Sequence, residues 1–252
     1  MSTWHKIYRV LINTCNTKIA ITKNSPRDTM STFVAKAIQL QRDSCKLWAQ
    51  IVLDFYNIDN FVETGTGAAE VVRSISNLRP TLNVHTIEII KEIYDRNIEA
   101  FKYLTNVNWH LGQSSEVMPE ILPQLNGNTL FWLDAHFPGA DFGLASYGDE
   151  EDLDKRLPLR SELELIVKGR DVSDDVFVID DLRVYEDGPF ETGNWAERNL
   201  YGGDGIAFIE DLFEDTHFVV RSYNKQGFVI LLPVNKNLGD EAENLIVGSV
   251  DE

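Results

Sequence analysis

Three aspartates directly follow two apolar segments that are typical of buried strands. Asp134 follows residues 129–133, and the pair Asp180 and Asp181 follows residues 176–179. Because the carboxyl ends of neighbouring parallel strands meet at one edge of a sheet, these side chains are expected to converge. Three carboxylates repel one another unless a cation or shared protons compensate, and hard oxygen ligands suit Mg²⁺, or else Mn²⁺ or Ca²⁺. The set therefore predicts a divalent-cation site, with a solvent-facing Asp181 that caps the next loop as the alternative.

One histidine lies close to this set. His136 comes two residues after Asp134, in the segment Asp-Ala-His-Phe-Pro-Gly. An imidazole with a pKa near ~6.5 can take a proton from a hydroxyl group at neutral pH. Three roles stay open for His136 at this point: a general base, a metal ligand, or a hydrogen-bonded structural residue.

A glycine-rich turn joins the strand predicted to end at Glu63 to the helix after it. Residues 63–69 read Glu-Thr-Gly-Thr-Gly-Ala-Ala. Glycines let the backbone approach a ligand closely, because no Cβ intervenes. The dinucleotide pattern G-x-G-x-x-G fails, since Glu70 stands in place of its last glycine and would repel a pyrophosphate. The turn thus predicts a bound ligand other than a dinucleotide, against the alternative of a turn with no ligand.

Two further strand ends could contribute to this site. Glu88 ends the second predicted strand, where a carboxylate can accept the protons of both hydroxyls of a ribose. Gln113 and Ser114 follow the third strand, where Ser114 could cap the next helix.

The elements that position these residues alternate between short apolar segments and helical patterns over residues 60–232, which predicts an α/β fold with a mostly parallel sheet. Strands are expected at residues 61–63, 82–88, 107–111, 129–133, 176–179, 218–223 and 227–232. The last two are joined by so few residues that they must pair antiparallel. Two long connections, residues 137–156 and 182–204, are expected to form lids over the site.

These motifs resemble those of the Rossmann-like (class I) S-adenosylmethionine-dependent methyltransferases, especially the metal-dependent O-methyltransferases of the catechol and macrocin types. The resemblance spans roughly residues 60–233, with Ala69 in place of the third glycine of the family's loop. It implies a three-layer sandwich around a seven-stranded, mostly parallel sheet whose last strand is antiparallel. It implies that S-adenosylmethionine contacts Glu63, Gly65, Thr66, Gly67, Glu88, Ile89, Gln113, Ser114 and Asp134, with Ile89 on the adenine face.

The resemblance also implies metal ligands at Asp134, Asp180 and Asp181, and direct methyl transfer to an oxygen of a small hydroxylated acceptor, such as a sugar or a phenol. The implied catalytic residues are His136, Asp134 and Asp181. Catechol O-methyltransferases carry a lysine base where this chain has Phe137, so His136 is the nearest substitute. The alternatives are a hydroxylase-like relative with a redox metal and a non-catalytic protein that binds S-adenosylmethionine.

Composition narrows the partners. The 252 residues carry a formal net charge of −17, which disfavours a nucleic-acid substrate. No segment approaches the ~18 apolar residues of a membrane helix. The two cysteines, Cys15 and Cys45, suggest free thiols in a reducing compartment, so we expect a cytoplasmic protein. The predicted parts are a helical extension at 1–56 that caps the site and could form a homodimer contact, a methyltransferase domain at 57–235, and an acidic tail at 236–252.

Overall fold

The computed structural model describes residues 49, 52–195, 204–223 and 225–234. Most of the predicted N-terminal extension and nearly all of the predicted acidic tail lie outside these residues. The last turn of the extension, residues 52–55, is helical and leads directly into the first strand of the sheet. It therefore lies at the edge of the sheet opposite to the strands' carboxyl ends.

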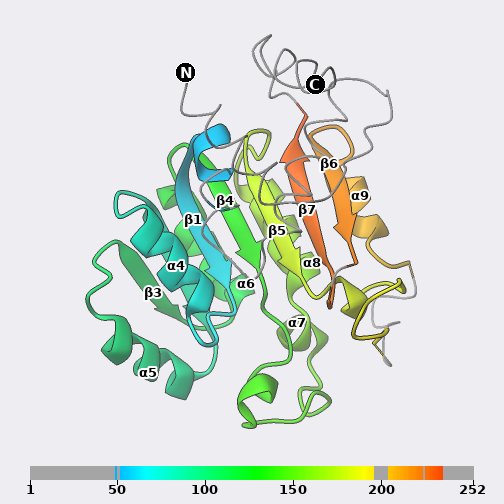
Figure 1. Ribbon diagram of the computed structural model, residues 1–252, viewed down its shortest axis with the longest axis horizontal. Helices are drawn as coiled ribbons and strands as arrows, with labels where there is room; N and C mark the ends of the chain where they lie inside the picture. Colours follow the sequence, from blue (N-terminus) through cyan, green and yellow to red (C-terminus); the bar gives the residue numbers. More distant parts are fainter. Residues whose placement is uncertain (1–48, 50–51, 196–203, 224, 235–252) are drawn as a thin grey trace, which may run out of the picture.

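Seven strands form one sheet in the order β3-β2-β1-β4-β5-β7-β6. Their bounds are β1 Ile58–Thr64, β2 Asn83–Glu88, β3 Val107–Leu111, β4 Asn128–Leu133, β5 Val176–Asp180, β6 His217–Ser222 and β7 Phe228–Pro233. Strands β1 to β5 pair in parallel, whereas β7 lies antiparallel between β5 and β6. The predicted mostly parallel seven-stranded sheet with an antiparallel last strand is confirmed (Figure 1).

Helices cover both faces of the sheet. Their bounds are α4 Glu70–Leu78, α5 Lys91–Phe101, α6 Ser114–Ile121, α7 Leu153–Arg156, α8 Leu159–Gly169 and α9 Ala207–Phe213, with short 3₁₀ turns at Leu122–Gln124, Ala140–Phe142 and Leu182–Val184. One hydrophobic cluster joins the sheet to α6, α8 and α9, and a second joins it to α4 and the turn at 52–55. The arrangement is the expected three-layer sandwich.

The alternation of side chains along a strand explains why the central strands are apolar throughout. In β4, Phe131 and Leu133 belong to the first cluster, while Leu130 and Trp132 belong to the second. Successive side chains of a strand point to opposite faces, so a strand covered on both faces needs apolar residues at every position. The continuous apolar pattern at residues 129–133 is therefore the signature of a sheet buried on both sides.

Of the roles left open for Ser114, that of a helix cap does not apply. The residue at the cap position of α6 is Gln113, whose side chain makes no capping hydrogen bond. Ser114 is instead the first residue of the helix and is buried.

The carboxyl ends of β1, β4 and β5 point to the same edge, and the long connection 137–156 lies beyond it (Figure 1). This connection contains the turn Ala140–Phe142 and the short helix α7. Across the described residues, no helix has the length and apolar character that crossing a membrane requires.

Candidate active site

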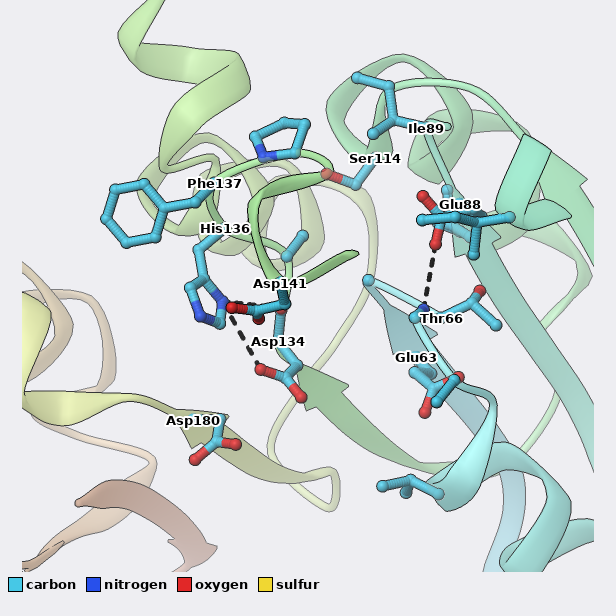
Figure 2. Close-up of a pocket in the computed structure, with 18 of the residues that line it drawn as sticks. Glu63, Thr66, Glu88, Ile89, Ser114, Asp134, His136, Phe137, Asp141 and Asp180 are labelled. Carbon is cyan, nitrogen blue, oxygen red and sulfur yellow. Dashed lines mark hydrogen bonds and ion pairs between the residues drawn. The ribbon is translucent and has the colours of Figure 1, made fainter. Parts of the chain in front are cut away.

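A cavity of about 630 Å³ opens at the carboxyl ends of β1, β2 and β4. Figure 2 shows Glu88 and Ile89 on one side of it, and His136, Asp134 and Asp180 on the other. All but one of the residues predicted to form the site line this cavity: Glu63, Gly65, Thr66, Gly67, Glu88, Ile89, Gln113, Ser114, Asp134, His136 and Asp180. The exception among the described residues is Asp181.

The glycine-rich turn crosses the floor of the cavity. Gly65 has a φ of +78°, and a Cβ on it would lie 2.6 Å from the carbonyl oxygen of Asp134. Gly65 is therefore required where the ends of β1 and β4 approach each other, rather than for access by a ligand. Gly67 differs, because a Cβ there would meet nothing closer than 3.8 Å.

Ala69 stands at the third glycine position of the family's loop, and its backbone explains why glycine is usual there. Ala69 has a φ of 58° and forms the cap position of α4 in the left-handed region. That conformation costs an alanine roughly 1–2 kcal/mol relative to right-handed backbone, whereas glycine adopts it freely. The turn keeps its course in spite of this substitution, because the amide of Ala69 donates to the Thr66 carbonyl at 2.8 Å.

Glu88 holds the two loops on either side of it. One carboxyl oxygen accepts from the Gly67 amide at 3.0 Å, and the other accepts from the Ile90 amide at 2.9 Å. Burial raises the pKa of Glu88, and these backbone hydrogen bonds oppose that rise. Each oxygen retains a lone pair, so the carboxylate can also accept the protons of two ribose hydroxyls.

Two polar residues that the sequence patterns did not single out hold the turn in place. The Thr86 hydroxyl donates to Glu63 at 2.6 Å and lies 2.6 Å from the Thr66 hydroxyl. The Asn97 amide group donates to the Gly67 carbonyl at 2.9 Å. Asn97 is a buried polar residue within α5, and such a residue in an otherwise amphipathic helix is the signal that could have identified it.

Glu63 is itself almost fully buried at the base of the cavity. Burial, followed by the charge of Asp134, raises the pKa of Glu63 to about 8, although the Thr86 hydrogen bond opposes the shift. A carboxyl group with this pKa is largely protonated at neutral pH and becomes ionised when a positive charge is bound beside it.

The opposite side of the cavity combines apolar and hydroxyl groups. Ile89 and Gln113 line it, and the first residue of α6, Ser114, lies next to the carboxyl group of Glu162 on α8. Glu162 is only 1% exposed, so it faces the protein interior rather than solvent. Burial raises the pKa of Glu162 to about 7, which the neighbouring hydroxyls of Ser114 and Thr64 oppose.

His136 bridges Asp134 and Asp181. Its Nδ1 lies 2.9 Å from the Asp134 carbonyl oxygen, and its Nε2 lies 2.8 Å from the carboxylate Oδ2 of Asp181. Burial would lower the pKa of His136, but the hydrogen bond to Asp181 and the surrounding carboxylates raise it to about 10. Both ring nitrogens thus already have oxygen partners within the protein.

The three aspartates do not assemble as the predicted set of metal ligands. Asp134 and Asp180 line the cavity, whereas Asp181 is 8% exposed, has a left-handed φ of 53° and turns its carboxylate to His136. Its amide also donates to Oδ1 of Asp180 at 2.9 Å. In the part of the chain that the structure describes, no group of three or more His, Cys, Asp or Glu side chains is placed to hold a metal ion. The residues present do not fit the predicted divalent cation.

An aromatic cluster joins the two long connections beside His136. The ring of Phe137 stacks on Trp195 at 5.2 Å and meets Tyr147 edge-on at 5.3 Å. Phe137, which stands where catechol O-methyltransferases have their lysine, thus packs into the protein and offers no base. Trp195 anchors the second connection to the first.

Comparison with known proteins identifies the fold. Neither a family model nor a curated protein matches the sequence. Among solved structures, a Staphylococcus aureus protein named as a caffeoyl-CoA O-methyltransferase matches with a TM-score of 0.52 at 12% identity, over 92% of this chain and 100% of that one. This chain has a methyltransferase fold.

Two more methyltransferases support that identification. A methyltransferase from Podospora anserina with bound S-adenosylhomocysteine (SAH) matches with a TM-score of 0.50 at 14% identity, over 86% of this chain and 99% of that one. An O-methyltransferase from Bacillus cereus in complex with SAH matches with a TM-score of 0.50 at 13% identity, over 92% of this chain and 98% of that one. The methyltransferase fold thus covers nearly the whole length of these proteins.

Proposed function

We propose that this protein is an S-adenosylmethionine-dependent methyltransferase that methylates an oxygen of a small hydroxylated acceptor, such as a sugar or a phenol. The observation that carries the proposal is that the Glu88 carboxylate, the glycine-rich turn, Asp134 and Asp180 all line the same cavity. The methyltransferase fold and the SAH-bound proteins that share it support the choice of cofactor.

The residues present fit the cofactor. Glu88 would hold the ribose hydroxyls, Ile89 and Ser114 would contact the adenine, and the turn at Gly67 would face the amino-acid part. Acidic residues of the lining outnumber the basic ones, Arg73, Lys155 and His136, which suits a ligand that carries a sulfonium and an ammonium group. When bound, S-adenosylmethionine supplies the methyl group, whose bond to sulfur breaks as its bond to the acceptor oxygen forms.

The chain's own contribution is positioning and proton removal. Asp134 faces the cavity, and burial together with the charge of Asp180 raises its pKa well above the ordinary range of an aspartate. A carboxylate with a raised pKa is a stronger base, so we assign to Asp134 the role of the base that accepts the proton of the acceptor hydroxyl. The cavity holds the acceptor oxygen in line with the methyl group, which is an effect of orientation. No step is assigned to a divalent cation.

Calorimetric titration with S-adenosylhomocysteine tests the cofactor. We expect micromolar binding to the wild-type protein and at least tenfold weaker binding to Ile89→Asp, because a carboxylate would then face the adenine. Leu111→Asp is the matched control, since Leu111 ends the adjacent strand, is 41% exposed and does not line the cavity. If the wild-type protein does not bind S-adenosylhomocysteine, the proposal fails at its first step.

Transfer of a labelled methyl group to a panel of sugars and phenols tests the reaction. We expect Asp134→Asn to bind S-adenosylhomocysteine within a few-fold of the wild type and to lose turnover with every acceptor that the wild type uses. Binding without turnover on any acceptor would favour a non-catalytic protein that binds S-adenosylmethionine.

A further inference from the structure

The region between Asp134 and Asp181 is filled by an imidazole. His136 contacts the Asp134 carbonyl through Nδ1 at 2.9 Å and the Asp181 carboxylate through Nε2 at 2.8 Å. Its Nδ1 also lies 3.6 Å from the Asp134 carboxylate. Both ring nitrogens therefore face oxygen atoms of the two aspartates, and the ring occupies the space between them.

This arrangement engages two of the carboxylate oxygen atoms that a metal ion shared by the three aspartates would use. Oδ2 of Asp181 is engaged by His136, and Oδ1 of Asp180 accepts the Asp181 amide. The left-handed backbone at Asp181 directs its side chain toward His136 rather than into the cavity lined by Asp134 and Asp180. A divalent ion shared by the three aspartates would have to displace the imidazole and turn Asp181.

The packing around His136 holds the ring where it is. The Phe137 ring meets the His136 ring edge-on at 5.5 Å and is itself stacked on Trp195. The guanidinium group of Arg183 also lies near, with its Nε 3.9 Å from Oδ1 of Asp181. The Asp181 carboxylate is therefore flanked by the side chains of His136 and Arg183.

We infer that His136 takes the place of a divalent cation between Asp134 and Asp181, so that the wild-type protein binds such ions only weakly and a metal site appears when the imidazole is removed. The inference concerns the same site as the proposed methyl transfer. Its primary test, however, is metal binding, which needs neither S-adenosylmethionine nor an acceptor.

The experiment is a titration of the full-length protein with Mn²⁺, in which electron paramagnetic resonance measures the concentration of the free ion. We expect no saturable binding to the wild type below millimolar Mn²⁺, and a dissociation constant at least tenfold lower for His136→Ala. The double variant His136→Ala/Asp181→Asn should lose that gain. His110→Ala serves as the matched control, because His110 pairs with His85 on β2 and does not line the cavity.

Thermal unfolding gives a second readout. Mg²⁺ at millimolar concentration should raise the melting temperature of His136→Ala and leave that of the wild type unchanged. Micromolar binding of one Mn²⁺ by the wild type, lost in Asp134→Asn, would overturn the inference, even if His136→Ala did not fold. Equal Mn²⁺ affinities of the wild type and His136→Ala would also overturn it.

The two proposals fail in distinguishable ways. A protein that does not bind S-adenosylhomocysteine would end the proposed function and leave the Mn²⁺ results standing. A protein that binds S-adenosylhomocysteine and also binds Mn²⁺ tightly would end only the inference about His136.

Discussion

Replacement of Glu88 by glutamine tests the adenosyl end of the cavity most directly. In the wild type the two carboxyl oxygens accept the amides of Gly67 and Ile90. In Glu88→Gln one oxygen becomes an NH₂ group, which can only donate, so either the Gly67 or the Ile90 amide loses its acceptor. The variant should lose at least one hydrogen bond to a charged group.

The expected magnitude follows from that loss. A hydrogen bond to a charged group contributes about 1.5–3 kcal/mol, and each 1.4 kcal/mol is a factor of about ten in affinity. We therefore expect Glu88→Gln to weaken S-adenosylhomocysteine binding by roughly ten- to a hundredfold. Burial raises the pKa of Glu88, so protonation should also weaken binding to the wild type as the pH falls, beginning at a higher pH than for an ordinary glutamate.

Isothermal titration calorimetry is the assay, at a temperature at which unfolding curves show both proteins to be folded. Glu92→Gln is the matched control, because it is the same substitution at an exposed position of the next helix, α5. A folded Glu88→Gln protein whose dissociation constant lies within twofold of the wild-type value would refute the assignment of the ribose to Glu88.

Three further predictions concern stability, each measured by urea unfolding. Burial lowers the pKa of His217 to about 4, against ~6.5 in the unfolded chain, so the unfolded state binds the proton first and stability is lost as the pH falls from 6.5 toward 4. His217 should thus make the wild type about 2 kcal/mol less stable at pH 5 than at pH 8. Urea unfolding of His217→Gln, measured at the same two pH values, should lack this part of the pH dependence. Phe177→Ala should cost about 3–5 kcal/mol, since Phe177 is fully buried among two phenylalanine rings and His217; a loss below 1 kcal/mol would contradict this packing. Gly65→Ala, whose Cβ would lie 2.6 Å from the Asp134 carbonyl oxygen, should cost at least ~1 kcal/mol more than Gly67→Ala, and equal losses would show that the close approach of β1 and β4 is not limiting.

The sequence by itself determined the layers of the fold and the order of strands and helices along the chain. Apolar residues at every position of 130–133 and 176–179 predict strands covered on both faces, and both strands lie at the centre of the sheet. The short link before Phe228 predicts the antiparallel last strand, because no crossover fits in it. These features are local in the chain, so composition and spacing suffice to predict them. The predicted site residues that line the cavity were found for the same reason: each lies at or just after the carboxyl end of a strand.

Only the tertiary structure decided how these side chains pair. Spacing places Asp181 beside Asp180 but says nothing of the left-handed φ that turns Asp181 toward His136. The burial of Glu162 beside Ser114 depends on how α8 packs against α6, and the role of Gly65 depends on the approach of β4. Contacts of this kind join residues far apart in the chain, and their geometry follows from packing rather than from any periodicity. The three aspartates therefore predict a metal site from their positions along the chain. In the folded protein, one of them, Asp181, pairs with the imidazole of His136 instead.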